Sequence, residues 1–323
     1  MPYAIVTSKD VASLFSNLGL PHGKIRQISG GWSSWTFEVE HESPGEPVEY
    51  SEVETGWIFR FPRNSVVAEN LQKGQAVLPV VASRVNFAVP CFEHVGTWRG
   101  QPYTGYRRIP GRALSARPST GNKLLVETAG SIGAALSSLH DIPTLLVAEA
   151  CAVEPTSNAW RQRYSALREE VRTNVLPVIE STDEDAAEST LDAVERGFDR
   201  FLDEELATLK DVALVHCDLG CEHILMDEDG MTVNGLIDFE DATVGDPTID
   251  FVGIFVTYGM EAVKRVRDSY RLSLDEQFER RLRSYTWMAS CHEMLYGLEE
   301  GRSDLVERGI AGLRTRLVDA GLP

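Results

Sequence analysis

Residues 215–226 read Val-His-Cys-Asp-Leu-Gly-Cys-Glu-His-Ile-Leu-Met, and residues 236–251 read Leu-Ile-Asp-Phe-Glu-Asp-Ala-Thr-Val-Gly-Asp-Pro-Thr-Ile-Asp-Phe. These stretches place two carboxylates, Asp218 and Asp238, twenty residues apart at the ends of short apolar segments that have the pattern of strands. His223 follows the first carboxylate by five residues. A loop, a hairpin and a second loop of this length can bring both carboxylates to one site.

Two carboxylates at this spacing suit phosphoryl transfer. One carboxylate orients the attacking hydroxyl group and accepts its proton, while a second holds Mg²⁺ across the β- and γ-phosphates of a nucleotide. We therefore predict that Asp218 is the catalytic base and also contacts the acceptor, and that Asp238 is a magnesium ligand. An isolated aspartate in a turn more often shapes or caps that turn, so this alternative stays open for each residue.

The two stretches resemble the catalytic core of the aminoglycoside phosphotransferase family, antibiotic kinases with a protein-kinase-like fold. His216–Leu219 resembles the catalytic loop of that family, and Ile237–Ala242 resembles its metal-binding segment. The Gly-Asp-Pro-x-x-Asp run over Gly245–Asp250 agrees with both motifs. In these motifs the chain is most similar to the aminoglycoside 2″-phosphotransferases and the macrolide 2′-phosphotransferases.

The resemblance implies an α+β, two-lobed fold with a small antiparallel-sheet N-lobe and a larger, mostly helical C-lobe. It implies a nucleotide-binding lobe over residues 1–108, and a catalytic and acceptor-binding lobe over residues 109–323 with a helical insertion at about 146–209. Hydrophobic patterns predict strands at residues 25–28, 35–39, 57–61, 86–90 and 103–109. They predict helices at residues 66–81, 123–140, 158–180 and 184–209, and a first helix capped at Thr7–Asp10.

The composition is that of a soluble globular protein, because 43% of the 323 residues are hydrophobic and 25% are charged. No apolar run is long enough for a membrane span, and the N-terminal residues lack the pattern of a signal peptide. We therefore expect a cytoplasmic protein without a membrane partner.

The five cysteines are odd in number and scattered, which argues against a disulfide framework. Four residues of the catalytic-loop region invite a zinc interpretation: His216, Cys217, Cys221 and His223. Structural zinc sites usually show a second closely spaced ligand pair, and the sequence has none elsewhere. We favour the interpretation that the two cysteines fill a packed loop.

The net charge of −18 is unevenly distributed along the chain. Residues 1–108 contain ten basic and ten acidic residues, whereas residues 109–323 contain 21 basic and 39 acidic ones. Such a surface disfavours nucleic acid and attracts a cationic small molecule. The sequence therefore predicts a small-molecule acceptor that carries positive charge, although an acidic surface also serves solubility.

The loop between the first two predicted strands can cover nucleotide phosphates with its backbone amides. Its candidate contacts are Ser29, Gly30, Gly31, Ser33 and Ser34. The run does not match Gly-x-Gly-x-x-Gly, and taken alone it would be an ordinary hairpin turn. The resemblance also implies that the hinge residues Arg107, Arg108 and Ile109 hold the purine through their backbone, which leaves ATP or GTP open as donor.

Arg60 stands where the family places a lysine that pairs with nucleotide phosphates. Arginine keeps the charge and can grip a phosphate, but it is bulkier than lysine. The following helix normally supplies a glutamate that holds the lysine. Here the matching position is about Gly74, and Glu69 is the one acid of that helix. The ion pair of the family is therefore expected to be absent or rebuilt.

Four more residues near the two carboxylates have predicted roles. His223 occupies the place of a metal-binding asparagine, so we predict a second-metal or phosphate contact, with a structural histidine as the alternative. His216 is expected to brace its loop, and Asp246 to cap a helix that has Pro247 at its first position. The resemblance implies that Asp250 ties this helix to the catalytic loop.

Five acids stand where the family lines its acceptor site: Glu240, Asp241, Glu293, Glu299 and Glu300. Each could instead be a solvated surface charge. Together these features predict a small-molecule kinase that uses Mg²⁺ and ATP or GTP to phosphorylate a hydroxyl of an aminoglycoside or macrolide antibiotic. A metabolic kinase of choline, an amino-alcohol or a sugar is an alternative, as is a catalytically weak relative that binds nucleotide or ligand. The oligomeric state stays open.

Overall fold

The computed structural model describes residues 3–20, 23–28, 33–41, 56–116, 126–182 and 184–322. The chain forms two compact units. Unit 1 comprises Met1–Ser119 and Cys221–Ala242, and unit 2 comprises Thr120–Gly220 and Thr243–Pro323. The segment Cys221–Ala242, which a linear division at residue 108 assigns to the C-terminal lobe, thus belongs with unit 1, because its strands hydrogen-bond there.

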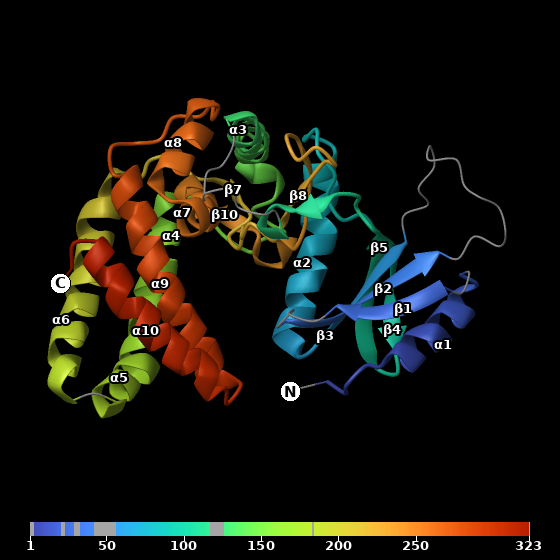
Figure 1. Ribbon diagram of the computed structural model, residues 1–323, viewed down its shortest axis with the longest axis horizontal. Coiled ribbons are helices and arrows are strands. Elements are labelled where there is room, and N and C mark those ends of the chain that lie inside the picture. Colours follow the sequence, from blue (N-terminus) through green and yellow to red (C-terminus); the bar gives the residue numbers. More distant parts are fainter. Residues whose placement is uncertain are drawn as a thin grey trace. The chain divides into compact units, whose positions relative to one another are not determined.

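Unit 1 is built on a five-stranded antiparallel sheet in the described part of the chain, with strand order β1-β2-β3-β5-β4 (Figure 1). The strands are β1 (Gly23–Ile28), β2 (Ser34–His41), β3 (Trp57–Pro62), β4 (Phe92–Trp98) and β5 (Gln101–Arg107). The central strand β3 is buried along its whole length. Arg60 lies in its middle, opposite Thr36 of β2 and Thr104 of β5.

Two helices accompany this sheet, α1 (Ser8–Leu18) and α2 (Ser65–Ala82). The predicted cap at the start of the first helix is confirmed, since the Thr7 side chain and the Asp10 carboxylate form a reciprocal capping box. The buried face of α1 packs into one cluster with the aromatic residues of β2 and β3. One face of the central strand, which carries Trp57, Phe59 and Phe61, is therefore covered by apolar side chains. Arg60 points to the opposite face, where it is also buried.

A second sheet of unit 1 carries the hairpin that leads to Asp238. Its strands are β6 (Arg112–Ala113), β8 (Ile224–Met226) and β9 (Val233–Leu236), in the order β6-β8-β9. The predicted strand at residues 86–90 is wrong, because this segment makes only an isolated parallel bridge between Ala88 and Gly235. Pro90 has no N–H to donate to a strand ladder, and regular pairing starts only at β4.

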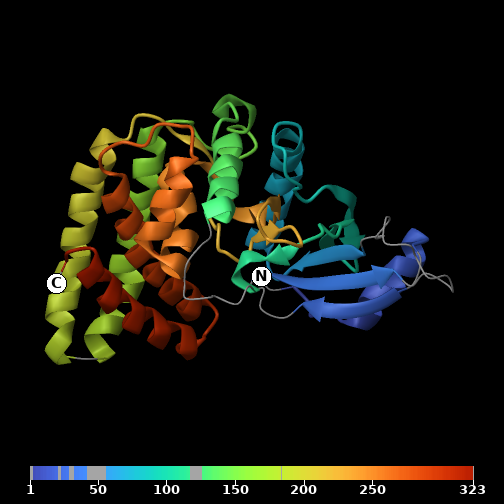
Figure 2. The same ribbon diagram turned by 45° about the horizontal axis from the view of Figure 1, so that its top comes forward.

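Unit 2 is mostly helical (Figure 2). Its helices are α3 (Val126–His140), α4 (Ser157–Glu170), α5 (Leu176–Thr182), α6 (Glu184–Arg200), α7 (Val252–Tyr258), α8 (Met260–Asp268), α9 (Phe278–Glu299) and α10 (Ser303–Asp319). π-Helical turns at Val171–Val175 and Phe201–Glu205 follow α4 and α6. Two short strands, β7 (Ala213–Val215) and β10 (Thr243–Gly245), pair in antiparallel fashion.

The core of unit 2 joins the helices that precede β7 to the C-terminal helices. Aromatic side chains of α4 and α6 pack with Tyr285 and Trp287 of α9, and α10 closes this cluster with Leu313 and Leu317. The expected α+β fold, with an antiparallel sheet in the N-terminal part and helices in the C-terminal part, is confirmed. No helix of the described residues is both long and apolar enough to cross a membrane.

Candidate active site

The loop that carries Asp218 is held through its backbone by Asp250. The two carboxylate oxygens of Asp250 accept hydrogen bonds from the N–H groups of His216 at 2.8 Å and Cys217 at 2.9 Å. Nε2 of His140 lies 2.9 Å from the same carboxylate and donates to it. Asp250 is fully buried, so these donors offset the cost of removing its charge from water. The start of the loop is thereby fixed at two consecutive backbone N–H groups.

The fixed loop presents Asp218 outward. His216 is fully buried, whereas Asp218 is exposed. Between them Cys217 has a φ of 69°, in the left-handed region that non-glycine residues rarely adopt. Such a conformation persists only where the surroundings impose it, as the two hydrogen bonds to Asp250 do here. The arrangement suits a carboxylate that must meet a substrate group.

The position of Asp250 depends in turn on a capped 3₁₀ helix, Pro247–Phe251. Asp246 caps it, since its Oδ1 accepts from the Thr248 N–H at 3.0 Å, and Pro247 follows as the first helical residue. The other oxygen of Asp246 accepts from Arg281 Nε at 2.6 Å and from the Tyr285 hydroxyl at 2.8 Å. The cap is therefore anchored to helix α9.

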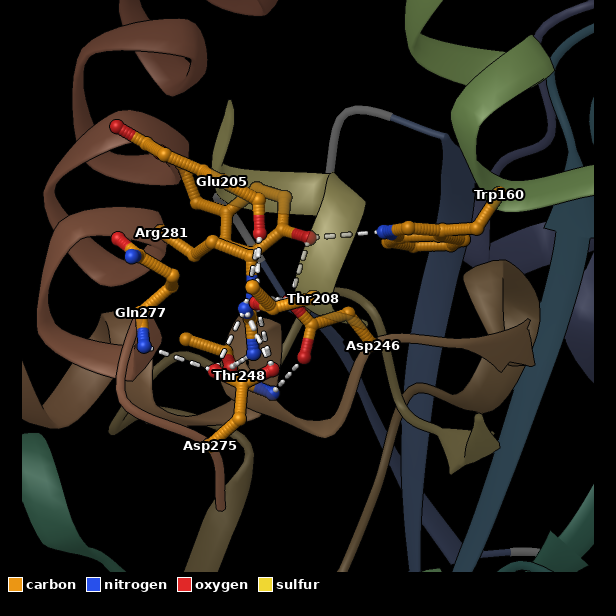
Figure 3. Close-up of polar contacts among 9 residues, drawn as sticks. Trp160, Glu205, Thr208, Asp246, Thr248, Asp275, Gln277 and Arg281 are labelled. Carbon is orange, nitrogen blue, oxygen red and sulfur yellow. Dashed lines mark hydrogen bonds and ion pairs between the residues drawn. The ribbon is translucent and has the colours of Figure 1, made fainter. Parts of the chain in front are cut away.

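Arg281 is the centre of a buried polar network in unit 2 (Figure 3). Its guanidinium reaches Asp246, the Asp275 carboxylate at 2.8 Å and the Glu205 carbonyl oxygen at 3.1 Å. Only 1% of Arg281 is exposed, and the pKa of its guanidinium is raised, because the nearby carboxylates outweigh the effect of burial. The sequence did not single out Arg281, since nothing local distinguishes it from the neighbouring arginines of α9.

In unit 1, Asp238 follows strand β9 and faces a cation and an imidazole. Its Oδ1 accepts from Arg60 Nη1 at 3.0 Å, and its Oδ2 lies 3.5 Å from Nε2 of His223. The backbone pairs the two segments as well, since the Ile237 N–H donates to the His223 carbonyl oxygen at 3.1 Å. Asp238 has a φ of 72°, again in the left-handed region. The structure thus brings together the two predicted metal ligands.

Asp238 and His223 fit a magnesium ion as partial ligands. Mg²⁺ prefers oxygen ligands and is usually held by one or two carboxylates together with phosphate oxygens and water. The Asp238 carboxylate meets this need, while imidazole is a poorer ligand for so hard a cation. The described residues contain no cluster of three or more His, Cys, Asp or Glu side chains suited to a metal. A magnesium ion here would depend on the phosphates of a nucleotide.

Arg60 has a second carboxylate partner, Glu240, in the 3₁₀ helix Phe239–Asp241. Arg60 Nη2 lies 2.8 Å from Glu240 Oε1, and both side chains are buried. The pKa of Arg60 is raised, because Asp238 and Glu240 together outweigh the effect of burial. Burial raises the pKa of Glu240 to about 7, and Arg60 acts in the opposite direction. The ion pair that the sequence left in doubt is thus rebuilt with a different acid.

Glu240 is more enclosed than the other residues predicted to line the acceptor site, and its acceptor-binding role stays a prediction. The Glu240 side chain is only 8% exposed and is occupied by Arg60 and by Ser33, whose hydroxyl donates to Oε2 at 3.1 Å. The other predicted acceptor residues differ from it. Asp241, Glu299 and Glu300 are exposed, and Glu293 is paired with Arg308. Their acceptor-binding role stays a prediction.

The predicted nucleotide contacts are only partly described. Ser29, Gly30 and Gly31 lie outside the described residues, while Ser34 is buried at the start of β2. The hinge residues have protein partners: the Arg107 guanidinium stacks on Trp57 at 3.9 Å, and Arg108 Nε pairs with Glu38 at 2.9 Å. The Arg108 N–H donates to the Gly56 carbonyl oxygen, and Ile109 is buried. Nucleotide binding by these residues also stays a prediction.

Comparison with known proteins assigns the family. A sequence model of the phosphotransferase enzyme family matches residues 24–286. The chain belongs to this family. The resemblance inferred from the catalytic-loop and metal-binding motifs is therefore confirmed, and the protein is a phosphotransferase.

Relatives within the phosphotransferase enzyme family show both the similarity and its limits. The chain is 26% identical over 264 residues to viomycin phosphotransferase from Streptomyces vinaceus, covering 79% of this chain and 85% of that protein. The GDP complex of aminoglycoside 2′-phosphotransferase-IIIa superposes with a TM-score of 0.77 at 21% identity, covering 96% and 98% of the two chains. Macrolide 2′-phosphotransferase type I gives a TM-score of 0.72 at 19% identity, covering 96% and 99%. The two solved structures confirm the fold.

We predict that replacing Arg281 by methionine strongly destabilises this phosphotransferase. Arg281→Met leaves the fully buried carboxylate of Asp246 without its cation, and breaking a buried pair in this way costs about 3–5 kcal/mol. The matched control is Arg280→Met, because Arg280 is the exposed neighbour on the same helix and should change the free energy of unfolding by less than about 0.5 kcal/mol. Urea denaturation measures both, and equal midpoints for the two variants would contradict the role assigned to Arg281.

Proposed function

We propose that the protein transfers the γ-phosphoryl group of ATP or GTP to a hydroxyl group of a small-molecule antibiotic, with Mg²⁺. The observation that carries this proposal is the exposed Asp218 on a loop whose backbone amides are held by the buried Asp250. Phosphoryl transfer passes through a loose transition state, so the protein contributes mainly positioning and electrostatic stabilisation. A rigid loop that presents one carboxylate meets the positioning requirement.

Each predicted side chain has a role in this reaction. Asp218 orients the acceptor hydroxyl and accepts its proton. Asp238, with His223, holds Mg²⁺, which neutralises charge on the phosphates when it is bound. Arg60 keeps its charge in the buried pair and is the cation of β3 that can donate to a phosphate oxygen. Because Arg60 does have carboxylate partners, the main reason to expect a catalytically weak relative is removed.

A cationic antibiotic is the acceptor class that the charges favour. The excess of acidic residues lies entirely in residues 109–323, which attracts cations. The curated relative is a viomycin phosphotransferase, which supports an antibiotic over choline, an amino-alcohol or a sugar. A solved relative of the same fold is a complex with GDP and kanamycin, which supports GTP beside ATP as a donor to test. A phosphorylation screen of viomycin, aminoglycosides and macrolides with ATP and with GTP identifies the acceptor and the donor.

Asp218→Asn should retain nucleotide binding but lose most of its turnover. The amide keeps the size of the side chain but cannot accept the proton, and such contributions are typically about 10²- to 10⁴-fold in rate. Steady-state kinetics with the best acceptor of the screen, beside nucleotide titration, measure both effects. Glu222→Gln is the matched control, because Glu222 is an exposed acid of the same segment. Near wild-type turnover of Asp218→Asn would remove Asp218 from the mechanism.

Nucleotide affinity should depend on Mg²⁺, and Asp238→Ala should abolish that dependence. The physical reason is that Asp238 supplies the carboxylate oxygen that a hard cation needs. Calorimetric titration of nucleotide with and without Mg²⁺ measures the dependence in both proteins. Equal affinity of the wild-type protein in the two conditions would contradict the assignment, and zinc bound to the purified protein would revive the cysteine–histidine interpretation.

Acceptor affinity should weaken as salt rises, while nucleotide affinity changes less. The acidic excess belongs to residues 109–323, and exposed charges are screened beyond about 8 Å at physiological salt. Titration of each ligand across a salt series measures this, with a steep effect for an aminoglycoside that carries several ammonium groups and a weak one for a macrolide. Tight, salt-insensitive macrolide binding without aminoglycoside turnover would reverse the preference for a cationic acceptor.

A further inference from the structure

The buried arginine of the central strand is shared between two carboxylates that differ in their surroundings. Arg60 Nη2 lies 2.8 Å from Glu240 Oε1, and Arg60 Nη1 donates to Asp238 Oδ1 at 3.0 Å. The Glu240 side chain is 8% exposed, whereas that of Asp238 is 29% exposed. Glu240 is thus the enclosed partner of the pair, and Asp238 is the partly open one.

Helix α2 does not supply this acid. Its one acidic residue, Glu69, is exposed. At Gly74 a side chain would start 3.6 Å from the ring of Phe92, which is an apolar surrounding. The 3₁₀ helix Phe239–Asp241 packs against α2 and carries Glu240 instead. The buried cation therefore receives its carboxylate from the segment that follows the predicted metal ligand.

Glu240 also reaches the segment before strand β2. The Ser33 hydroxyl donates to Glu240 Oε2 at 3.1 Å, while the other oxygen, Oε1, faces Arg60. A carboxylate with one oxygen on a guanidinium and the other on a hydroxyl ties together three parts of unit 1 that are far apart in sequence. The contact with Ser33 is a hydrogen bond to an ionisable acceptor, and such bonds are stronger than neutral ones. The contact with Arg60 is an ion pair.

We propose that Glu240 is a positioning residue for nucleotide phosphates, acting through Arg60 and Ser33. It fixes the guanidinium on β3 and the end of the loop before β2 in one arrangement, so that both can meet a phosphate without reorganisation. The inference rests on the proposed function, since it names which chain residue organises the donor-binding side of that reaction.

The test is nucleotide affinity in the absence of acceptor. Glu240→Gln keeps the size of the side chain but removes its charge, and we expect ATP and GTP affinity to fall about tenfold or more, since a charge-assisted contact is lost. The KM of the acceptor should stay within about twofold. The matched control is Glu69→Gln, an exposed acid of the adjacent helix, which should bind nucleotide as the wild-type protein does.

A double-mutant cycle separates positioning from a general structural effect. Arg60→Met should weaken nucleotide binding by itself, and adding Glu240→Gln to it should weaken binding by clearly less than in the wild-type background, because only the contact with Ser33 is then left for Glu240 to act through. Additive losses in the cycle would overturn the inference. Thermal melting of every variant shows whether it is folded under the titration conditions.

Two further outcomes are decisive. If Glu240→Gln binds nucleotide as the wild-type protein does but raises the acceptor KM, Glu240 belongs to the acceptor site and the inference is wrong. If Glu240→Gln does not fold, Glu240→Asp tests the same point with the charge kept and the carboxylate drawn back from Arg60. We expect Glu240→Asp to weaken nucleotide binding at least about threefold, and unchanged binding would overturn the inference.

The wild-type titration distinguishes this inference from the proposed function. A wild-type protein that binds neither ATP nor GTP would contradict the proposed function and the inference with it. A wild-type protein that binds nucleotide, beside a Glu240→Gln variant of equal affinity, would contradict the inference alone.

Discussion

Two adjacent backbone N–H groups, those of His216 and Cys217, share one buried carboxylate, and the loop that carries Asp218 depends on that contact. Asp250 is fully buried, so its oxygens need hydrogen-bond donors within the protein. The amides at the root of the loop and the His140 ring supply them. The loop cannot move away without leaving a buried charge unpaired, and this holds Cys217 in its left-handed conformation.

The same principle links the loop to the helical core of unit 2. Asp250 lies on a short 3₁₀ helix that is capped by Asp246. The Asp246 carboxylate accepts hydrogen bonds from Arg281 and Tyr285 of α9, and these contacts fix the position of the short helix. A buried ion pair adds little net stability over an apolar replacement of the same shape, but removing one member costs several kcal/mol. Such a pair favours one arrangement of the side chains around it, and a reaction that depends mainly on positioning needs such a fixed arrangement.

Unit 1 solves a different problem with the same kind of contact. An arginine on the most buried strand of the sheet needs carboxylates, and the neighbouring helix offers none to it. The segment that follows strand β9 places both Asp238 and Glu240 next to Arg60, because the two acids are only two residues apart in the chain. The departure from the family pattern at residue 60 and the acid at residue 240 are therefore parts of one local solution.

Much of the fold followed from local patterns. The capped start of α1, the strands around Trp35 and Trp57 and the long helix of residues 65–82 were predicted from periodicity and capping residues, which act over a few positions. The prediction of a strand at residues 86–90 was wrong, because this short apolar segment forms a single bridge to Gly235 and no ladder of hydrogen bonds. The pattern of apolar residues in the sequence does not distinguish a strand in a sheet from a buried segment with a single bridge.

The sequence by itself determined the family and the residues to which we assign the chemistry, since His-x-Asp, the five-residue step to His223 and the Asp-Phe-Glu-Asp run are local signals. Only the tertiary structure decided their partners. Arg60 and Asp238 are 178 positions apart, and Arg281 and Asp246 are 35 apart, so no spacing rule connects them. The physical reason is burial: a charge removed from water must pair with whichever opposite charge the packing brings near, and that choice is made by the three-dimensional arrangement of strands and helices.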